Sequence, residues 1–208
     1  METKILTSQN NLNEIVRLSS DLLLKGEIIA FPTETVYGIG CLLNETESIE
    51  NIFKLKGRNK NKPLAAHISD LSMVKKLSDN LPDIFYKIAD KFMPGPISII
   101  IDKSDSVSDI ITSGLSSIGV RFPDNDIFNA ICQNVGQPIV ATSANISGKS
   151  SPENAESVIR DFNGKLPLII DDGETKYKQD STVIKISDNK INVLRNGAID
   201  IQNFEEFF

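Results

Sequence analysis

Positively charged side chains gather next to the only histidine of this 208-residue chain. The stretch FKLKGRNKNKPLAAHI, residues 53–68, holds five of the 22 Lys and Arg residues and ends just after His67. Lys56 and Arg58 flank the end of an expected helix at Gly57. Arginine suits forked contact with phosphate or carboxylate, and lysine acts as a compact point charge. Taken together they indicate a local anion site, although each cation alone is better explained as a solvated surface charge.

Two further arginines, Arg121 and Arg195, also follow apolar segments, where a cation can be directed into a site. Nucleophilic catalysis has no comparable support. The pattern GxSxG does not occur, and His67 would have to serve any Ser or Cys triad alone. In LAAHI a satisfied, partly buried histidine is more common than a catalytic base. Covalent catalysis is therefore not expected.

Three polar loops, PTETVYG, VRFPDN and ATSANISGKSSP, each follow an apolar segment, and in α/β sheets ligands bind beyond strand ends. In the third loop Gly148 lets the backbone approach a ligand closely, and short polar side chains offer hydrogen bonds to phosphate or ribose oxygens. The same composition equally fits an ordinary strand-to-helix connection starting at Ser151. Neither GxxxxGK[ST] nor GxGxxG is present. The short polar residues of this loop are Thr142, Ser143, Asn145, Ser147, Ser150 and Ser151.

Composition sets the class of protein. With 40% hydrophobic and 24% charged residues, the chain fits one globular domain over residues 1–208. A formal charge of −6 disfavours broad attraction to nucleic acid or to an anionic membrane. Cys41 and Cys132 are expected to be reduced, buried thiols. No basic-flanked apolar leader and no run of about 18 apolar residues occurs, so we expect a soluble cytoplasmic protein.

Helical and strand-like patterns alternate along the chain, which predicts an α/β fold with a mixed sheet and flanking helices. The strands at the C-terminal end have no helix between them, so some antiparallel pairing is expected there. We expect a loop at PTETVYGIG and a mobile loop over residues 103–117. The expected helices cover residues 11–26, 45–57, 70–78, 82–92, 124–135 and 153–162, and the expected strands cover 28–31, 64–68, 97–102, 118–122, 168–171, 181–186 and 190–195.

Seven segments in order resemble the YrdC family of L-threonylcarbamoyl-AMP synthases over nearly the whole chain. Lys56-x-Arg58 with Ser143-x-Asn145 resembles the composite motif of that family. In two departures, Asn59 stands where a proline usually follows the motif arginine, and Ser98 replaces a frequent threonine. The seven segments are FPTETVYGIG, KLKGR with KPLAAHI, MPGPISIII, IGVRFPDN, PIVATSANISGKSSP, DSTVIKI and VLRNG.

The resemblance implies a single-domain YrdC-like fold, a twisted mixed sheet with a concave ligand cleft, and no additional C-terminal domain. It also implies a nucleotidyl transfer in which L-threonine, bicarbonate or CO2, and ATP give threonylcarbamoyl-AMP and pyrophosphate. By analogy with phosphoryl transfer, positioning and electrostatics can carry such catalysis without a covalent intermediate. Mg2+ is expected to enter with ATP, held chiefly by ATP and water, with no dedicated metal site in the protein.

Site residues carried over from the family motifs fall into three groups. Arg121 is expected to act as the fork for the α-carboxylate of threonine, and His67 as a hydrogen-bonding wall rather than an obligatory base. The catalytic group is Lys56, Arg58, Ser143 and Asn145. The ATP-binding group is Arg58, Lys62, Ser117, Ser143, Ser151 and Arg195. The threonine-binding group is Thr35, His67, Arg121, Ala141 through its backbone, and Ser181.

Partners follow from the same resemblance. The product of the family is consumed by a separate transferase complex that modifies tRNA, so transient contact with that complex is possible and direct tRNA binding is expected to be weak. A rival interpretation is a non-catalytic RNA-binding or ribosome-associated protein, which the net charge disfavours. A second enzyme reading, the carbamoyl-adenylate chemistry of hydrogenase-maturation proteins, belongs to chains that carry additional domains.

Overall fold

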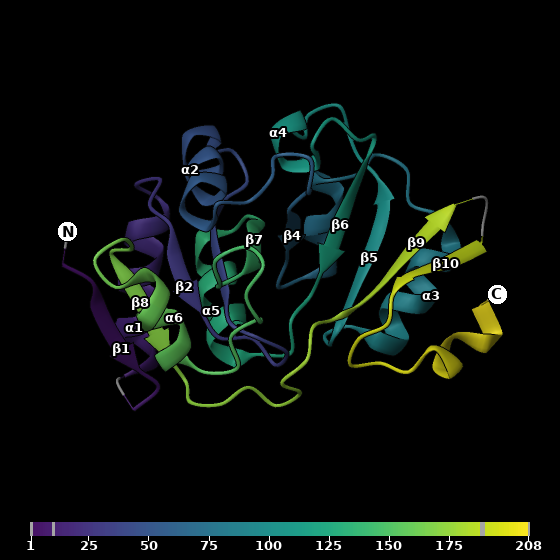
Figure 1. Cartoon of the computed structure of the whole chain (residues 1–208). Helices are drawn as coiled ribbons and strands as arrows, with labels where there is room; N and C mark the ends of the chain where they lie inside the picture. The colour runs from purple at the N-terminus through teal and green to yellow at the C-terminus, as the bar shows by residue number, and fades with distance from the viewer. Residues whose placement is uncertain (1, 10, 188–189, 208) are drawn as a thin grey trace.

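The computed structural model describes residues 2–9, 11–187 and 190–207. Within these residues ten strands form one sheet in the order β1-β8-β2-β3-β7-β4-β6-β5-β9-β10, which runs from left to right in Figure 1. Parallel and antiparallel pairs alternate irregularly, and β9 and β10 pair antiparallel. The expected mixed sheet and the antiparallel pairing near the C-terminal end are confirmed.

Short strands and short helices alternate along most of the chain. The strands are β1 (Lys4–Thr7), β2 (Ile29–Phe31), β3 (Gly38–Leu42), β4 (Ala65–His67), β5 (Ile97–Asp102), β6 (Ser117–Arg121), β7 (Ile139–Ser143), β8 (Leu168–Asp171), β9 (Thr182–Ser187) and β10 (Lys190–Arg195). The helices are α1 (Leu12–Leu23), α2 (Thr46–Lys56), α3 (Asp83–Phe92), α4 (Asp109–Thr112), α5 (Asp126–Val135) and α6 (Ala155–Phe162), with 3-10 helices η1 (Leu71–Lys76) and η2 (Ile201–Phe207).

Local sequence explains where several helices begin and end. Asn11, Asn125 and Asn154 each accept a hydrogen bond from a backbone N–H in the first turn of the helix that follows, which satisfies a donor that the helix leaves unpaired. Gly57 ends α2 in the left-handed conformation, with φ of 59°. Lys56, the last residue of α2, and Arg58 therefore flank the end of the helix, as the sequence predicts.

Two hydrophobic cores lie on opposite faces of the sheet. Alternation within the strands separates them: Ala30 of β2 belongs to one core, and its neighbours Ile29 and Phe31 belong to the other. The larger core packs α2, α3, α4 and α6 against the strands from β8 to β10 in the order of the sheet. The smaller core packs α1 and α5 against β1, β8, β2, β3 and β7.

The smaller core leaves part of its face of the sheet uncovered. Among the described residues, β5, β6 and β9 contribute nothing to it. Residues such as Ser98, Gly119 and Val183 occupy this face instead, because they alternate with the buried Ile99, Val120 and their neighbours. The sheet therefore has helices on one side of these strands and an open surface on the other, where a ligand site can form.

Two expectations from the sequence are wrong in part. The end of the expected loop PTETVYGIG, residues 38–40, belongs to strand β3 (Gly38–Leu42), where a Cβ on Gly40 would lie 2.6 Å from the carbonyl oxygen of Val140. Glycine there permits close packing rather than a turn. The expected mobile loop contains α4, and Val107 and Ile111 anchor it in the larger core. The polar residues around Val107 and Ile111 make this segment resemble a solvent-exposed loop in the sequence.

The remaining differences are small. Residues Leu71–Lys76 form a 3-10 helix where a helix was expected, and β1 and η2 were not expected. Cys41 and Cys132 are free and buried, as predicted, and burial raises the pKa of the Cys132 thiol to about 11. Neither thiol is therefore suited to nucleophilic chemistry. Within the described chain, no helix has the length and apolar character to cross a membrane.

Candidate functional site

A cavity of about 290 Å³ opens on the uncovered face of the sheet. The floor of the cavity carries only small side chains. Ala65 of β4 pairs with Ala141 of β7 on one side and with Gly119 of β6 on the other. Arg58, Arg121 and Arg195 line the same cavity from segments far apart in the sequence, together with hydroxyls of Thr33, Ser98, Thr142, Ser143 and Ser181. Three guanidinium groups and several hydroxyls around one hollow are suited to binding anions.

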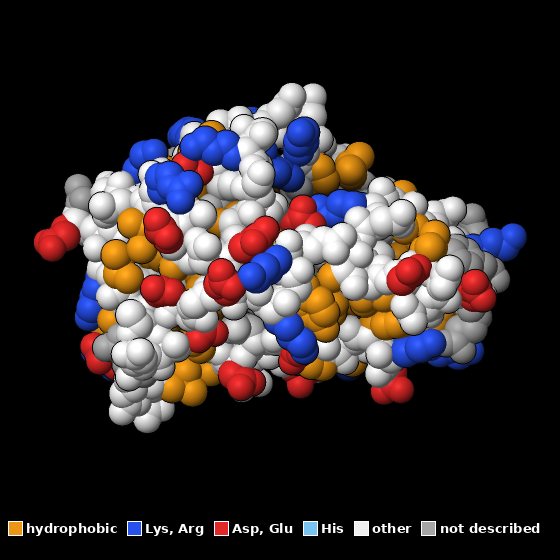
Figure 2. All heavy atoms as spheres, turned by 60° about the horizontal axis from the view of Figure 1, so that its bottom comes forward, with side chains coloured by type: hydrophobic (Ala, Val, Ile, Leu, Met, Phe, Trp, Pro, Cys, Tyr) orange, Lys and Arg blue, Asp and Glu red, His pale blue; other side chains and the backbone are white. Residues whose placement is uncertain are grey.

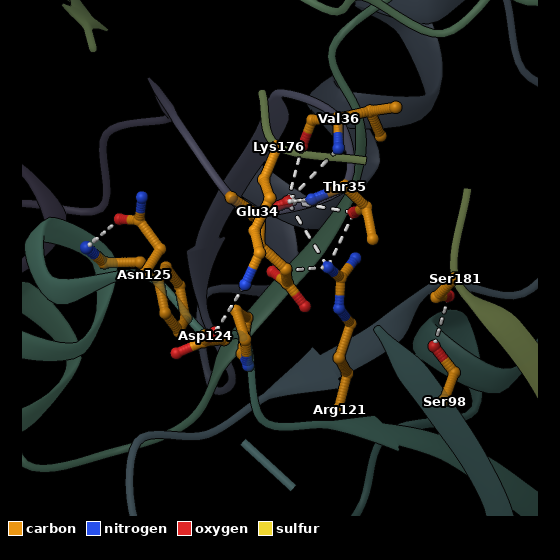
Figure 3. A network of polar contacts seen from close by, with 12 residues as sticks. Glu34, Thr35, Val36, Ser98, Arg121, Asp124, Asn125, Lys176 and Ser181 are labelled. Atoms are coloured by element: carbon orange, nitrogen blue, oxygen red, sulfur yellow. Dashed lines mark hydrogen bonds and ion pairs between the residues drawn. The ribbon is translucent and has the colours of Figure 1, made fainter. Parts of the chain in front are cut away.

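Arg121, at the end of β6, is buried beside the loop that follows β2. Its Nη2 donates to Thr35 Oγ1 at 2.6 Å, to Glu34 Oε2 at 2.8 Å and to Thr33 Oγ1 at 3.3 Å (Figure 3). The Thr33 hydroxyl also donates to the carbonyl oxygen of Val36, which fixes the loop. Arg121 therefore reaches the cavity already held by an anion and two hydroxyls.

His67, the last residue of β4, is 7% exposed and lines the cavity beside Arg121. Phe31 and Phe128 contact its ring at centroid distances of 6.5 and 5.9 Å. Burial, and then the charge of Arg121, lower the pKa of His67 to about 3. The imidazole is therefore neutral at pH 7 and forms an aromatic wall with nitrogen atoms for hydrogen bonding.

We predict that the imidazole of His67 does not titrate between pH 7.5 and 5. The pKa of His67 in the folded chain lies below its unfolded value near 6.5. Between these two values the imidazole binds a proton in the unfolded chain but not in the folded chain. Stability is therefore lost as pH falls from 6.5 toward 3, by about 2 kcal/mol between pH 6.5 and 5. The measurement is the single imidazole NMR signal of tag-free protein. A midpoint near pH 6.5 would contradict the neutral wall.

Arg58 enters the cavity from the loop between α2 and β4. Its Nε donates to the carbonyl oxygen of Lys62 at 3.1 Å and its Nη2 to that of Pro63 at 2.9 Å, so the loop orients the guanidinium. Asn59 stabilises this loop, because its Oδ1 accepts from the backbone N–H of Asn61 at 2.9 Å. The side chain of Asn59 thus supplies local order where the family usually has proline.

Lys56 holds the loop that contains Ser143 and Asn145. Its Nζ donates to the carbonyl oxygens of Ser143 and Asn145 and to Asn145 Oδ1, the last two at 2.6 and 3.2 Å. Ser143 Oγ donates to Asn145 Oδ1 at 2.6 Å. Burial and the nearby charge of Arg58 lower the pKa of Lys56 to about 7. Three acceptors use all the protons of the ammonium, so Lys56 supports the loop from behind.

Replacing Lys56 with methionine is expected to destabilise the protein by about 3 kcal/mol, because it leaves buried carbonyl oxygens of the loop without donors. Methionine retains the buried apolar stem, so packing changes little. Urea denaturation measures the loss. The matched control is Lys54→Met, which removes an exposed cation from the same helix and should change stability by less than about 0.5 kcal/mol. Equal losses in the two variants would contradict the supporting role.

The far wall of the cavity is held by contacts around Asp180. Its Oδ1 accepts from Ser151 Oγ at 3.0 Å, and its Oδ2 lies 3.7 Å from Arg195 Nη1. Arg195 Nε and Nη2 donate to the carbonyl oxygen of Ser181 at 3.1 and 2.9 Å. The hydroxyls of Ser181 and Ser98 lie 2.9 Å apart. These contacts join β5, β9 and β10 to the loop before α6.

The structure brings most of the expected site residues to one cavity. Lining it are Arg58, His67, Arg121, Ala141, Ser143, Ser181 and Arg195. Six others do not line it. Thr35, Lys56, Asn145 and Ser151 touch residues that do, namely Arg121, Ser143 or Asp180. Lys62 is exposed on the loop that orients Arg58, and Ser117 begins β6, two residues before Gly119 in the floor. Direct ligand contact stays a prediction for all thirteen residues.

Several lining residues were missed. Thr33 and Tyr37 belong to PTETVYG, and Asp180 precedes Ser181 in DSTV. Tyr37 donates to the carbonyl oxygen of Gly173 at 2.7 Å and accepts from the N–H of Asp172 at 2.9 Å, and burial raises its pKa. These residues could have been found only because they belong to the motifs PTETVYG and DSTV. Spacing alone does not show which residues of a loop face the cavity.

Charges outside the cavity are mixed. Figure 2 shows Lys and Arg side chains gathered along the upper edge of one face of the molecule, with acidic and basic side chains interspersed over the rest of that face. No group of three or more His, Cys, Asp and Glu side chains within the described ranges could hold a metal ion. The three arginines of the cavity are therefore a local feature of an acidic chain.

An open mixed sheet with a cavity lined by arginines and hydroxyls defines an α/β domain whose cavity is suited to anionic small molecules. The chain belongs to the Sua5/YciO/YrdC family, whose model, described as "Telomere recombination", matches residues 21–197. Threonylcarbamoyl-AMP synthase of Pyrococcus abyssi is 37% identical over 191 residues, which cover 92% of this chain and 56% of that protein. The corresponding Bacillus subtilis protein is 38% identical over 185 residues, covering 88% and 54%.

The chain thus spans about half the length of these two relatives. A putative threonylcarbamoyl-AMP synthase of Methanocaldococcus jannaschii is 37% identical over 180 residues, which cover 86% of this chain and 84% of that protein. The structure of P. abyssi Sua5 complexed with L-threonine superposes with a TM-score of 0.94 at 35% identity, covering all of this chain and 61% of that one. Escherichia coli YciO, at 22% identity and TM-score 0.86 over 99% and 100% of the two chains, shares the fold.

Proposed function

We propose that this chain is an L-threonylcarbamoyladenylate synthase, which converts L-threonine, bicarbonate or CO2, and ATP to threonylcarbamoyl-AMP and pyrophosphate. The observation that carries the proposal is the meeting of Arg58 and Arg121 in one cavity. The reaction needs two anions side by side, the carboxylate of threonine and the phosphates of ATP. The names of the relatives and the threonine complex of P. abyssi Sua5 support this assignment.

In the proposed reaction the amine of threonine first takes up CO2, losing its proton to solvent, and becomes a carbamate. A carbamate oxygen then attacks the α-phosphorus of ATP, and the bond to the leaving pyrophosphate breaks. Charge builds on the phosphoryl oxygens, where Arg58 and Arg195 provide stabilisation beside the loop of Ser143. Arg121 holds the α-carboxylate, and the neutral His67 shapes the wall beside it. No covalent enzyme intermediate is required.

The assignments to individual ligands extend the same proposal. The ATP side of the cavity is completed by Lys62, Ser117 and Ser151. The threonine side is completed by Thr35, Ser181 and the backbone of Ala141. Lys56 and Asn145 act by holding the loop of Ser143 in place. Mg2+ bound to ATP would neutralise phosphate charge. Because the described residues offer no cluster of acidic ligands, ATP and water would hold most of its coordination shell; among the described residues that line the cavity, Asp180 is the one acidic side chain.

The test is incubation of the purified protein with ATP, Mg2+, bicarbonate and single amino acids, following pyrophosphate and the adenylate by mass spectrometry. Pyrophosphate release that depends on threonine, together with a threonylcarbamoyl-AMP mass, is the expected result. Equal activity with serine would overturn the specificity. RNA binding with steep salt dependence and no threonine-dependent pyrophosphate release would favour the RNA-binding rival.

We also propose that the product passes to a tRNA-modifying transferase complex in the cytoplasm, through at most transient contact.

A further inference from the structure

Glu34 is a buried carboxylate that pairs with Arg121 but does not itself line the cavity. Its side chain is 1% exposed, and its Oε2 lies 2.8 Å from Arg121 Nη2 (Figure 3). Its Oε1 is buried without a hydrogen-bond partner. Within the described residues Arg121 is the only cation paired with Glu34. The neighbouring Lys176 pairs with Asp124 instead, at 3.7 Å. Arg121 thus has a counter-ion in the structure without any ligand.

The pair forms a wall between two cavities. Arg121 lines the main cavity, whereas Glu34 lines a smaller one of about 160 Å³ that also contains Asp124, Asp172 and Glu174. A substrate in the main cavity therefore meets Arg121 directly and Glu34 only through it. Lys176 also lines the smaller cavity but pairs with Asp124, so among the described residues Arg121 is the cation that holds Glu34.

Arg121 is already partly occupied before substrate arrives. Its Nη2 contacts three oxygen atoms, and its Nε is buried without a partner. Among the described residues no partner is found for Nη1, so Nη1 is the nitrogen that remains for an anion in the cavity. The full fork that would hold a carboxylate by two bonds is not free, and the charge behind it is partly neutralised.

We propose that Glu34 sets the affinity of Arg121 for the substrate carboxylate by acting as a fixed, competing carboxylate. This inference rests on the proposed function. A buried arginine without a counter-ion would bind a carboxylate tightly, because the ligand would then supply the missing partner. The adenylate product retains the carboxylate of threonine and has to leave the site. Glu34 therefore lowers ground-state affinity for both and favours release.

The test compares binding of L-threonine and of L-threoninamide, which lacks the carboxylate, by isothermal titration calorimetry. Glu34→Gln removes the charge and keeps an oxygen that can accept from Arg121 Nη2, while Thr33 and Thr35 still hold the guanidinium. We expect the Kd for L-threonine to fall roughly 10-fold, since opposing charges a few ångströms away in a partly buried site change binding by about that factor. The Kd for L-threoninamide should change less than about 2-fold.

Two matched variants serve as controls. Glu34→Asp keeps the charge but withdraws it from Arg121, so its Kd for L-threonine should lie between those of the wild type and of Glu34→Gln. Asp21→Asn removes an exposed carboxylate that pairs with Arg17 on α1 and should have no effect on either ligand. If Glu34→Gln is poorly folded, L-threonine should restore its thermal transition and L-threoninamide should not, because only the former supplies a new counter-ion.

The outcomes separate the explanations. Weaker binding of L-threonine alone would show that Glu34 orients Arg121 rather than moderating its charge, and would overturn the inference. Weaker binding of both ligands would show a merely structural role and would also overturn it. If the wild-type protein binds L-threonine and Glu34→Gln behaves identically, the inference fails and the proposed function stands. If the wild-type protein does not bind L-threonine, both fail.

Discussion

Replacing Arg58 with alanine is expected to reduce threonine-dependent adenylate formation by roughly 10²- to 10³-fold, the usual cost of losing one charge-stabilising group in a transition state. The loss should fall mainly on kcat, because phosphoryl charge develops during the reaction. The fold should be unaffected, since Arg58 donates only to carbonyl oxygens of its own partly exposed loop. Steady-state kinetics of pyrophosphate release measure the effect.

A neighbouring cation provides the control for Arg58. Lys60 lies on the same loop and pairs with Glu50 on the surface at 3.9 Å, and it does not line the cavity. Lys60→Ala removes the same charge from the same segment and should leave the rate within about 2-fold of wild type. If the two variants lose activity equally, the loop contributes only general positive charge. Near-normal turnover of a folded Arg58→Ala variant would remove Arg58 from the mechanism.

Replacing Arg121 with methionine is expected to raise the Kd for L-threonine by roughly 100-fold, because the carboxylate loses a charge-assisted hydrogen bond in a buried site. Stability should also fall by about 3–5 kcal/mol, since Glu34 would remain as a buried charge without its partner. Binding is measured by calorimetry and stability by urea denaturation. An unchanged Kd would assign the carboxylate of threonine to another group.

The double variant Arg121→Met with Glu34→Gln separates these two effects. It removes both charges, so most of the lost stability should return, while L-threonine binding should remain as weak as in Arg121→Met alone. Recovery of binding in the double variant would mean that the single variant failed through misfolding. ATP binding should be close to wild type in the double variant, because Arg58 and Arg195 are unchanged.

Local patterns in the sequence were sufficient for much of the fold. Asparagine caps, the glycine that ends α2 and apolar alternation lead to the helices and most strands, because these depend on contacts between residues close in the chain. Strand β3 was missed for a tertiary reason. Gly38 and Gly40 resemble turn residues in sequence, but the side chain of Phe31 and the backbone of Val140 pack so closely there that a Cβ would clash.

The sequence by itself determined that cations, hydroxyls and small residues sit near strand ends, and its motifs indicated the family. Only the tertiary structure decided which of them share a cavity. Ala65, Gly119 and Ala141 form one floor because β4, β6 and β7 are neighbours in the sheet, although they are far apart in the chain. Pairing between such strands is set by how the whole core packs, and no local pattern encodes it.

The same limit applies to the charged groups. Lys56 and Arg58 are two residues apart, yet one is buried behind the Ser143 loop and the other lines the cavity, since the chain leaves the helix at Gly57 between them. Glu34 and Thr35 are adjacent, and both converge on an arginine 86 or 87 positions away. Which charged side chain is neutralised, and by which partner, depends on burial and on the distance between the two groups. Those quantities exist only once the sheet has formed.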